Sequence, residues 1–237
     1  MQTDKFTYTI QYQDVDEHYL LRLYTLENYL LNSAGLSADK HGFGVKYLHP
    51  QHLTWVITNM SLEMRALPCP CDEMVVETWV EEHIHTLSVR NFRIYANGIL
   101  QGEARTLWAI INTDDRTIQS IFDRDVFHVG ESNEHLDLSP ARRHTHIGKF
   151  DESILHRIAY SDVDYNGHCN SCKYLERMLD LYEPAGLVPF RLDLRYSREV
   201  YKGDNVVVGY AQVDGNHCYE LHAPNGELCC SAILSAL

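Results

Sequence analysis

The sequence lacks long hydrophobic runs, and this deficit narrows the class of protein. None of its apolar segments approaches the roughly 20 residues that a membrane-spanning helix needs, so we expect no membrane partner. The N-terminal stretch MQTDKFTYTIQYQD has neither the apolar core of a secretory signal nor the arginine-rich, acid-poor bias of a transit peptide. We therefore expect a cytoplasmic location.

Positive charge is also scarce. The 20 Lys and Arg against 33 Asp and Glu give a formal net charge of −13 at pH 7. Because phosphate binding needs a basic surface, this balance predicts no nucleic-acid partner. The seven cysteines are an odd number and are expected to be thiols in a cytosolic protein. The length of 237 residues fits one large domain or two fused small ones.

The chain contains two copies of one pattern. Three matches occur in the same order: DVD at 14–16 and 162–164, Asp72 and Asp204 ahead of β-branched runs, and Asn-Gly at 97–98 and 225–226. The spacing between copies shortens from match to match, as expected when the second copy has shorter loops. The pattern predicts a first unit at 1–122, a polar connector at 123–149 and a second unit at 150–237.

Each copy predicts a strand, then a helix, then several strands. The first strands are expected at 5–13 and 154–160, and the helices at 20–34 and about 169–182. Gly35 is expected to end the first helix, and Pro184 closes off the second. The later segments mix alternation with apolar runs, and Asn-Gly turns favour antiparallel pairing. These features predict an α+β fold in which each antiparallel sheet wraps around its helix.

In a duplicated unit, features shared by both copies are expected to serve the fold. Polar features found in one copy only are candidates for function. After the shared DVD, only the second copy has the alternating series Asp164, Asn166 and His168. The alignment also pairs Leu67 with Glu199, so a carboxylate stands where the first copy is apolar. If these four polar groups converge on one pocket, they suit general-base activation of water and polarisation of a carbonyl. The N-terminus of the following helix would favour an oxyanion.

Simpler explanations apply to the same segment. An aspartate of the DVD turn could serve only as a helix cap, and His168 could be an ordinary core or surface histidine. Cys169 and Cys172 form a C-x-x-C motif, but the parallel βαβ context of a thioredoxin-type site is missing. Zinc would need a second ligand pair at suitable spacing. We therefore expect no metal and no cofactor.

Longer segments of the chain resemble the acyl-acyl-carrier-protein thioesterase family, in its bacterial form. LTWVITNMSLEM and ARTLWAIINTDDR are similar to the family pattern in the first copy. In the second copy, DVDYNGHCNSCKYLE is similar to the family's D-x-D-x-N-x-H-x-N-N-x-x-Y segment, and LRYSREVYKGD to its Y-R-R-E-C-x-x-x-D segment. The resemblance covers nearly the whole chain and implies two tandem hot-dog units.

The resemblance also implies an activity and a catalytic group. Members of the family end fatty-acid synthesis by hydrolysing the acyl thioester, and by position the catalytic residues would be Asp164, Asn166, His168 and Glu199. Val200 stands where plant relatives often have cysteine, so we expect water attack assisted by carboxylates, with an acyl-carboxylate intermediate as the alternative. A CoA-ester thioesterase of the same fold and a non-catalytic acyl-binding protein are rival functions. The latter would not need paired carboxylates.

Two further sets of residues follow from the resemblance. The first unit would supply an apolar tunnel for the acyl chain, with candidate lining residues Trp55, Ile57, Met60, Leu62 and Met64. Acyl carrier protein is acidic like this chain, so a local basic cluster would have to bind it. The candidates are Arg142, Arg143, Lys149, Arg198 and Lys202. The oligomeric state stays open, with a homodimer as one candidate.

Overall fold

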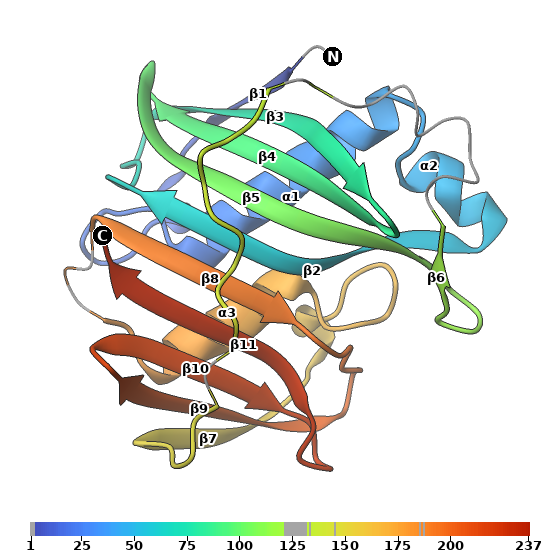
Figure 1. The fold of residues 1–237 in the computed structure, drawn as a ribbon. Coiled ribbons are helices and arrows are strands. Elements are labelled where there is room, and N and C mark those ends of the chain that lie inside the picture. The colour runs from blue at the N-terminus through green and yellow to red at the C-terminus, as the bar shows by residue number, and fades with distance from the viewer. Residues whose placement is uncertain (1–2, 121–131, 133, 145, 185, 187) are drawn as a thin grey trace.

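One antiparallel sheet carries the whole architecture (Figure 1). The computed structural model describes residues 3–120, 132, 134–144, 146–184, 186 and 188–237. Within them, ten strands follow the order β1-β3-β4-β5-β2-β8-β11-β10-β9-β7, and the eleventh, β6, pairs with β5. The strands are β1 (Asp4–Thr9), β2 (Leu53–Met64), β3 (Glu73–Ile84), β4 (Leu87–Ala96), β5 (Ile99–Asn112), β6 (Ile118–Gln119), β7 (Glu152–Arg157), β8 (Phe190–Tyr196), β9 (Asn205–Val213), β10 (Asn216–His222) and β11 (Leu228–Ala236).

Three α-helices and several short 3-10 turns complete the described structure. The helices are α1 (Leu23–Lys40), α2 (Val45–Leu48) and α3 (Ser171–Leu181), and the turns include η1 (Tyr12–Asp14), η2 (His49–Gln51) and η4 (Tyr160–Asp162). No helix among the described residues is long and apolar enough to cross a membrane.

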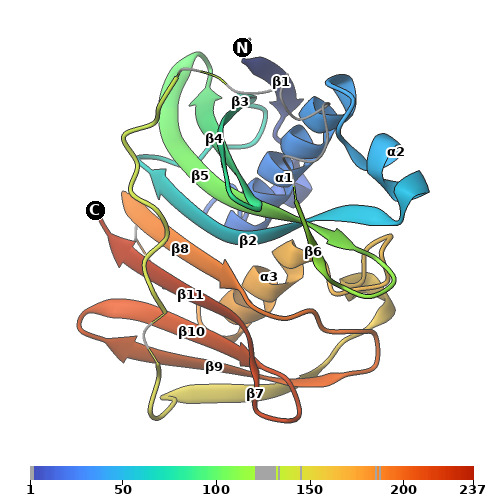
Figure 2. The ribbon, with the colours of Figure 1, turned by 45° about the vertical axis from the view of Figure 1, so that its right-hand side comes forward.

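The sheet divides into two halves, each curled around one helix (Figures 1 and 2). The strands β1 to β6 surround α1, and β7 to β11 surround α3. This confirms the predicted α+β fold. The two halves are continuous, because β2 pairs with β8 from Asn59↔Arg195 to Met64↔Phe190. The sequence did not predict this pairing.

The main hydrophobic cluster spans both halves. Leu26 and Leu30 of α1 belong to the same buried cluster as Leu175 and Met178 of α3. The two helices pack against each other on the concave side of the sheet. Smaller clusters lie within each unit, such as Phe43 and Leu48 in the first and Ala211 and Ile233 in the second. Because apolar burial is the dominant favourable term in folding, the shared cluster holds the two units together.

The two acidic turns make matching contacts. The carboxylate Oδ2 of Asp14 accepts a hydrogen bond from the amide of Gln11 at 2.8 Å, and that of Asp162 accepts one from Ala159 at 2.8 Å. These turns form η1 and η4, so β1 and β7 end before them, earlier than the sequence predicted. The repeat read from the sequence is therefore present in the backbone.

The predicted end of the first helix at Gly35 is wrong, because α1 continues to Lys40. A glycine inside a helix costs only about 1 kcal/mol relative to alanine. The additional turns bury Ser37 and Ala38, and Ser37 Oγ donates to the buried carboxylate of Asp4 at 2.8 Å. The second helix ends at Leu181, before Pro184, as predicted.

The described part of the connector crosses the outer face of the sheet (Figure 1). The Arg191 side chain holds it there by donating to Ser139 Oγ at 2.7 Å and to the Pro140 carbonyl at 3.1 Å. Residues 123–131, 133 and 145 of the predicted connector lie outside the described residues. The unit boundaries stay predictions.

Candidate active site

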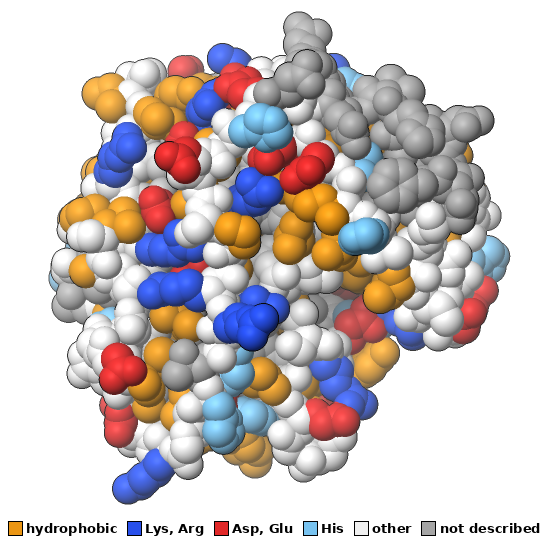
Figure 3. Space-filling model, viewed as in Figure 1, with side chains coloured by type: hydrophobic (Ala, Val, Ile, Leu, Met, Phe, Trp, Pro, Cys, Tyr) orange, Lys and Arg blue, Asp and Glu red, His pale blue; other side chains and the backbone are white. Residues whose placement is uncertain are grey.

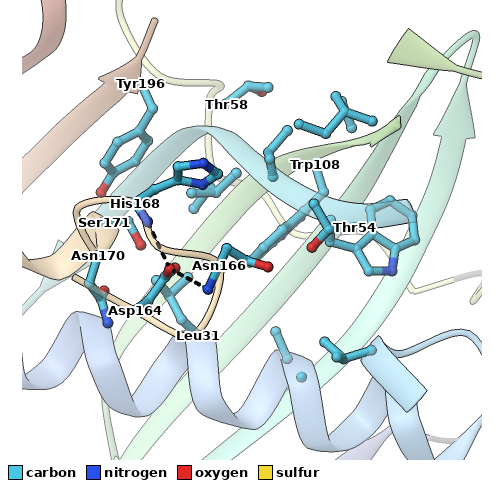
Figure 4. Close-up of a pocket in the computed structure, with 18 of the residues that line it drawn as sticks. Leu31, Thr54, Thr58, Trp108, Asp164, Asn166, His168, Asn170, Ser171 and Tyr196 are labelled. Carbon is cyan, nitrogen blue, oxygen red and sulfur yellow. Dashed lines mark hydrogen bonds between the residues drawn. The ribbon is translucent and has the colours of Figure 1, made fainter. Parts of the chain in front are cut away.

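A cavity of about 690 Å³ lies between the two units, on the concave side of the sheet (Figure 4). The first unit contributes one face of α1 together with parts of β2 and β5. Most of the lining residues of α1 are spaced three or four positions apart in the sequence, as residues on one side of a helix are. The members of this face are Asn28, Leu31, Asn32, Gly35, Ala38 and Asp39, and Ala34 and Leu36 beside them also line the cavity.

The second unit contributes a loop with three of the predicted residues. Asp164 Oδ1 accepts hydrogen bonds from the amides of Asn166 at 2.8 Å and His168 at 3.4 Å (Figure 4). Gly167, at φ +79°, permits the tight turn between them. The carboxylate of Asp164 thus folds the loop on which Asn166 and His168 reach the cavity.

The first copy has the same loop contact without the chemistry. Asp16 Oδ1 accepts from the amides of His18 at 2.8 Å and Leu20 at 3.0 Å. The hydrogen bonds of Asp164 are therefore structural features of both copies. The helix cap is a different residue, because Asn170 Oδ1 accepts from the amide of Cys172 at 3.1 Å at the start of α3.

Glu199 lies in the loop after β8, not on a strand as the alignment suggested. The Cys169 amide donates to the Val200 carbonyl at 2.8 Å, which ties this loop to the segment that precedes α3. Glu199 Oε1 consequently lies 3.4 Å from His168 Nδ1. All four predicted residues line the cavity, and their catalytic role stays a prediction.

Arg116 of the first unit completes the cluster, and sequence reasoning did not assign it. It lies in the turn between β5 and β6 and forms an ion pair with Glu199 through Nη2. The same nitrogen is 3.5 Å from His168 Nδ1. The side chains of Arg116 and Glu199 are each 30% exposed, so the pair is partly shielded from water. The available signal was its place at the end of ARTLWAIINTDDR.

Two tyrosines hold the Glu199 loop and the His168 ring. The buried hydroxyl of Tyr174 accepts from the Val200 amide at 3.2 Å and lies 3.3 Å from the Arg198 carbonyl, to which it donates. Burial raises the pKa of Tyr174, so the hydroxyl stays protonated and can make both bonds. The Tyr201 ring meets His168 edge-on, with centroids 4.9 Å apart.

The cysteines beside the site are poor nucleophiles. Burial raises the pKa of Cys169 to about 12 and that of Cys172 well above the ordinary thiol value. The reactive form of cysteine is the thiolate, which neither residue forms appreciably at neutral pH. All seven cysteines are free, as predicted, with Cys69 and Cys71 exposed.

The predicted tunnel residues fall into two groups. Trp55 and Ile57 line the cavity. Met60, Leu62 and Met64 are fully buried in the shared core and are not among the lining residues. All five lie on β2, but beyond Asn59 this strand pairs with β8, where the helices of both units cover the concave face.

The predicted carrier-protein-binding residues also fall into two groups, one on the connector and one near Glu199. Arg142 forms an ion pair with the buried Asp193, and this contact anchors the connector to the outer face of the sheet. Arg143 and Lys149 are exposed on the same segment. In Figure 3, Lys and Arg side chains gather in the middle of this outer face, whereas the cavity lies on the concave side.

The remaining two candidates belong to the loops around Glu199. Arg198 lines the cavity and pairs with Glu227. Lys202 lies over the Tyr160 ring, 5.6 Å from its centroid. Of the basic candidates in the described residues, Arg198 is thus the one placed at the cavity itself.

Two curled half-sheets around paired helices define a tandem hot-dog protein with a polar cluster on a cavity between its two units. Two family models cover most of the chain: the acyl-ACP thioesterase N-terminal domain matches residues 2–127, and the acyl-ACP thioesterase C-terminal domain matches residues 148–230. The chain belongs to the acyl-ACP thioesterase family.

Individual relatives are distant in sequence. The chain is 26% identical over 211 residues to an oleoyl-acyl carrier protein thioesterase of Coriandrum sativum chloroplasts, covering 77% of this chain and 55% of that protein. A palmitoyl-acyl carrier protein thioesterase of Arabidopsis thaliana chloroplasts is 25% identical over 217 residues, covering 86% of this chain and 52% of that protein. The chain spans about half the length of the curated relatives it matches.

Solved structures match over nearly the full length. An acyl-ACP thioesterase from Bacteroides thetaiotaomicron has a TM-score of 0.88 at 27% identity, covering 98% of this chain and 97% of that chain. The 12:0-ACP thioesterase from Umbellularia californica has a TM-score of 0.85 at 17% identity, covering 98% and 96%, and shows the fold alone.

Proposed function

We propose that the protein hydrolyses the thioester of fatty acyl-acyl-carrier protein, releases the free fatty acid and so ends fatty-acid synthesis. The observation that carries the proposal is the meeting of Arg116, His168 and Glu199 beside a cavity of about 690 Å³. A cavity lined mainly by apolar side chains suits an acyl chain, and the polar cluster suits thioester hydrolysis. Membership of the family adds to this support.

In the proposed reaction, Glu199 is the general base. Its carboxylate takes a proton from a water molecule, and the water oxygen attacks the acyl carbon. The developing oxyanion accepts hydrogen bonds from the Asn166 amide and the His168 imidazole, which both reach the cavity from one loop. The C–S bond then breaks, and the departing thiol takes up the proton.

Arg116 and Asp164 act as positioning residues in this scheme. The guanidinium group of Arg116 fixes one oxygen of Glu199 and leaves the other for the water. Asp164 holds the loop amides and thereby sets where Asn166 and His168 point. The first unit therefore contributes to the chemistry as well as to the cavity wall.

The acyl chain would lie along α1, whose lining residues run from Asn28 to Asp39. At 1.5 Å per residue, this stretch measures about 16 Å. The carrier protein would approach over the loop of Arg198 and Lys202, where the pantetheine thioester can reach Glu199. Trp55 and Ile57 would contact the chain from β2.

The proposal includes a cytoplasmic location and leaves a homodimer as one candidate assembly. Free thiols persist in reducing compartments, and all seven cysteines are free, including the adjacent Cys229 and Cys230. Cell fractionation tests the compartment, and light scattering on the purified protein tests the assembly.

The first experiment measures thiol release from a panel of acyl-carrier-protein and acyl-CoA substrates. We expect turnover of carrier-protein esters, with CoA esters hydrolysed less efficiently. Activity on CoA esters alone would overturn the substrate assignment. Binding of acyl chains without hydrolysis of either ester would instead identify an acyl-binding protein.

The second experiment tests the site with a matched control. We predict that Glu199→Gln or Asp164→Asn lowers kcat by about 10²–10⁴, because the first removes the general base and the second removes the charge that strengthens the hydrogen bonds positioning Asn166 and His168. Asp16→Asn removes the same charge from the matching loop contact in the copy without chemistry and should cost stability without a comparable loss of activity. Equal activity losses in the Asp16 and Asp164 variants would mean that the loop contact matters only for folding.

A further inference from the structure

A second polar cluster lies on the outer face of the second unit, on the side of the sheet opposite the cavity. His144 and His146 of the connector meet Glu220 of β10, and one ligand atom from each lies within 4.8 Å of the others. Figure 3 shows histidine side chains grouped on this face over the strands of the second unit. None of the three residues lines the cavity, so the proposed hydrolysis does not use them.

Glu220 is an unusual residue for its position. It lies on the face of β10 that also carries Cys218, beneath the connector residue Ile147, and its side chain is only 1% exposed. Its Oε1 atom accepts from the Ile147 amide at 2.8 Å. Burial of a carboxylate is costly unless a cation and hydrogen bonds compensate its charge.

Other buried carboxylates of the outer face have arginine partners. Glu81 pairs with Arg105 at 3.1 Å, and Asp193 pairs with Arg191 at 2.9 Å. Within the described part of the chain, the ion-pair partners of Glu220 are histidines only. A site with a buried negative charge and several imidazoles has the composition of a transition-metal site.

The distances agree with such a site. His144 Nε2 lies 2.8 Å and His146 Nδ1 lies 3.6 Å from Glu220 Oε1. In a tetrahedral site with metal–ligand bonds of about 2.0–2.1 Å, neighbouring ligand atoms lie about 3.4 Å apart. All three ligand atoms lie within 4.8 Å of one another, so shifts of up to about 1.4 Å, most simply a rotation of the exposed His146 side chain, would bring them onto one ion. The His146 side chain is 79% exposed, so water can supply the fourth ligand.

His222 supports the carboxylate from the other side. Its Nε2 lies 2.7 Å from Glu220 Oε2, and its Nδ1 lies 3.1 Å from the Gly226 carbonyl. Hydrogen bonds to the free oxygen of a metal-binding carboxylate are typical of such sites, because they orient the ligand.

Among the described residues, the first copy shows no such arrangement. There the connector residue His135 meets Glu81 at 3.0 Å, and Arg105 already compensates the carboxylate. As with the catalytic loop, the distinctive group of side chains is present in one copy only. The fold therefore does not require it.

We propose that His144, His146 and Glu220 bind a divalent transition-metal ion, Zn²⁺ in the first instance, which fastens the connector to the second half of the sheet. The sequence suggested no metal because the H-x-H pair and Glu220 are far apart along the chain and only the fold joins them. The ion would stabilise the folded protein and take no part in the hydrolysis.

The test uses the tag-free full-length protein, stripped with a chelator and titrated with Zn²⁺ by calorimetry. Exposed thiols also bind zinc, so the titration is made in a Cys69→Ser/Cys71→Ser background. We expect one ion per chain. At zinc concentrations about 100-fold above Kd, the Tm should rise by about 5–10 °C.

Variants then locate the ion. His146→Ala, at an exposed position, should weaken zinc binding at least tenfold without disturbing the fold, and His144→Ala/His146→Ala should abolish it. His18→Ala/His49→Ala removes two exposed histidines elsewhere and should bind zinc like the parent. The proposal is overturned if the parent binds no zinc, or if the His146 variant and the parent bind it equally.

Discussion

Replacement of Arg116 by glutamine tests whether the first unit takes part in catalysis. The substitution removes the cation that pairs with Glu199 and leaves a shorter, neutral polar side chain. Arg116 belongs to the β5–β6 turn, whereas Glu199 belongs to the second unit. Loss of activity would therefore show that the second unit's catalytic group depends on the first.

The magnitude follows from the burial of the pair. A hydrogen bond to a charged group contributes about 1.5–3 kcal/mol, and here both side chains are 30% exposed, so we take the lower half of that range. If the contact is needed in the transition state, kcat should fall about 10- to 50-fold, or about 1.4–2.3 kcal/mol. KM should change little, because Arg116 contacts Glu199 and not the distal part of the acyl site.

The assay is steady-state hydrolysis of acyl-carrier-protein substrates, with thermal unfolding measured in parallel. Lys5→Gln is the matched control: it removes one cation from a surface ion pair with Glu77 in the same unit. We expect unchanged kcat in the control. Because the Arg116 pair is only partly buried, its loss should lower Tm by a few degrees at most.

Two rescue measurements separate positioning from a general structural effect. Arg116→Lys should recover part of the lost kcat, since lysine supplies the charge without the planar fork. Added guanidinium ion should partly restore the Arg116→Ala variant. An Arg116→Gln enzyme with kcat within twofold of wild type would refute the role of Arg116, as would a loss fully explained by unfolding.

Three further predictions concern the core, the cavity and the thiols. Burial raises the pKa of Glu27 to about 7 from an ordinary 4.5, so the stability that its protonated form contributes is lost as the pH rises from about 4.5 to 7. Over that range, the free energy of unfolding in urea should fall by about 3 kcal/mol more for wild type than for Glu27→Gln. The same pH dependence in both proteins would contradict this prediction. Gly35 lines the cavity, and a Cβ there meets no atom within 4 Å. Gly35→Leu should therefore raise Tm and lower kcat/KM about tenfold or more for acyl chains long enough to reach this position, measured with substrates of different chain length. An unchanged chain-length profile would place the acyl chain elsewhere. Cys169→Ser should retain most of the activity if the buried thiol is not a nucleophile, and loss of acyl transfer with intact folding would reverse that conclusion.

Much of the candidate site could be predicted from the sequence because the two copies within the chain can be compared with each other. The matching contacts of Asp16 and Asp164 explain why both copies keep this aspartate. Asn166, His168 and Glu199 differ between copies, and all line the cavity. Arg116 escaped notice because no spacing rule links a turn of one unit to a loop of the other.

The tunnel residues show the limit of strand periodicity. Trp55, Ile57, Met60, Leu62 and Met64 follow one another along β2, and the sequence gives no sign of where the cavity ends. That boundary depends on how α1 and α3 cover the concave face. The sequence of β2 alone does not indicate which of its residues are covered by a helix from elsewhere in the chain.

The sequence by itself determined the local features of this protein: two copies of a strand, an acidic turn, a helix and hairpins, with chemistry added to the second. Turn-forming residues and hydrophobic periodicity act over a few residues, so they can be recognised in the sequence alone. Only the tertiary structure decided that β2 and β8 join the copies into one sheet, that Arg116 reaches Glu199, and that His144 and His146 meet Glu220. These contacts depend on the packing of distant segments around a shared core, which local patterns do not encode.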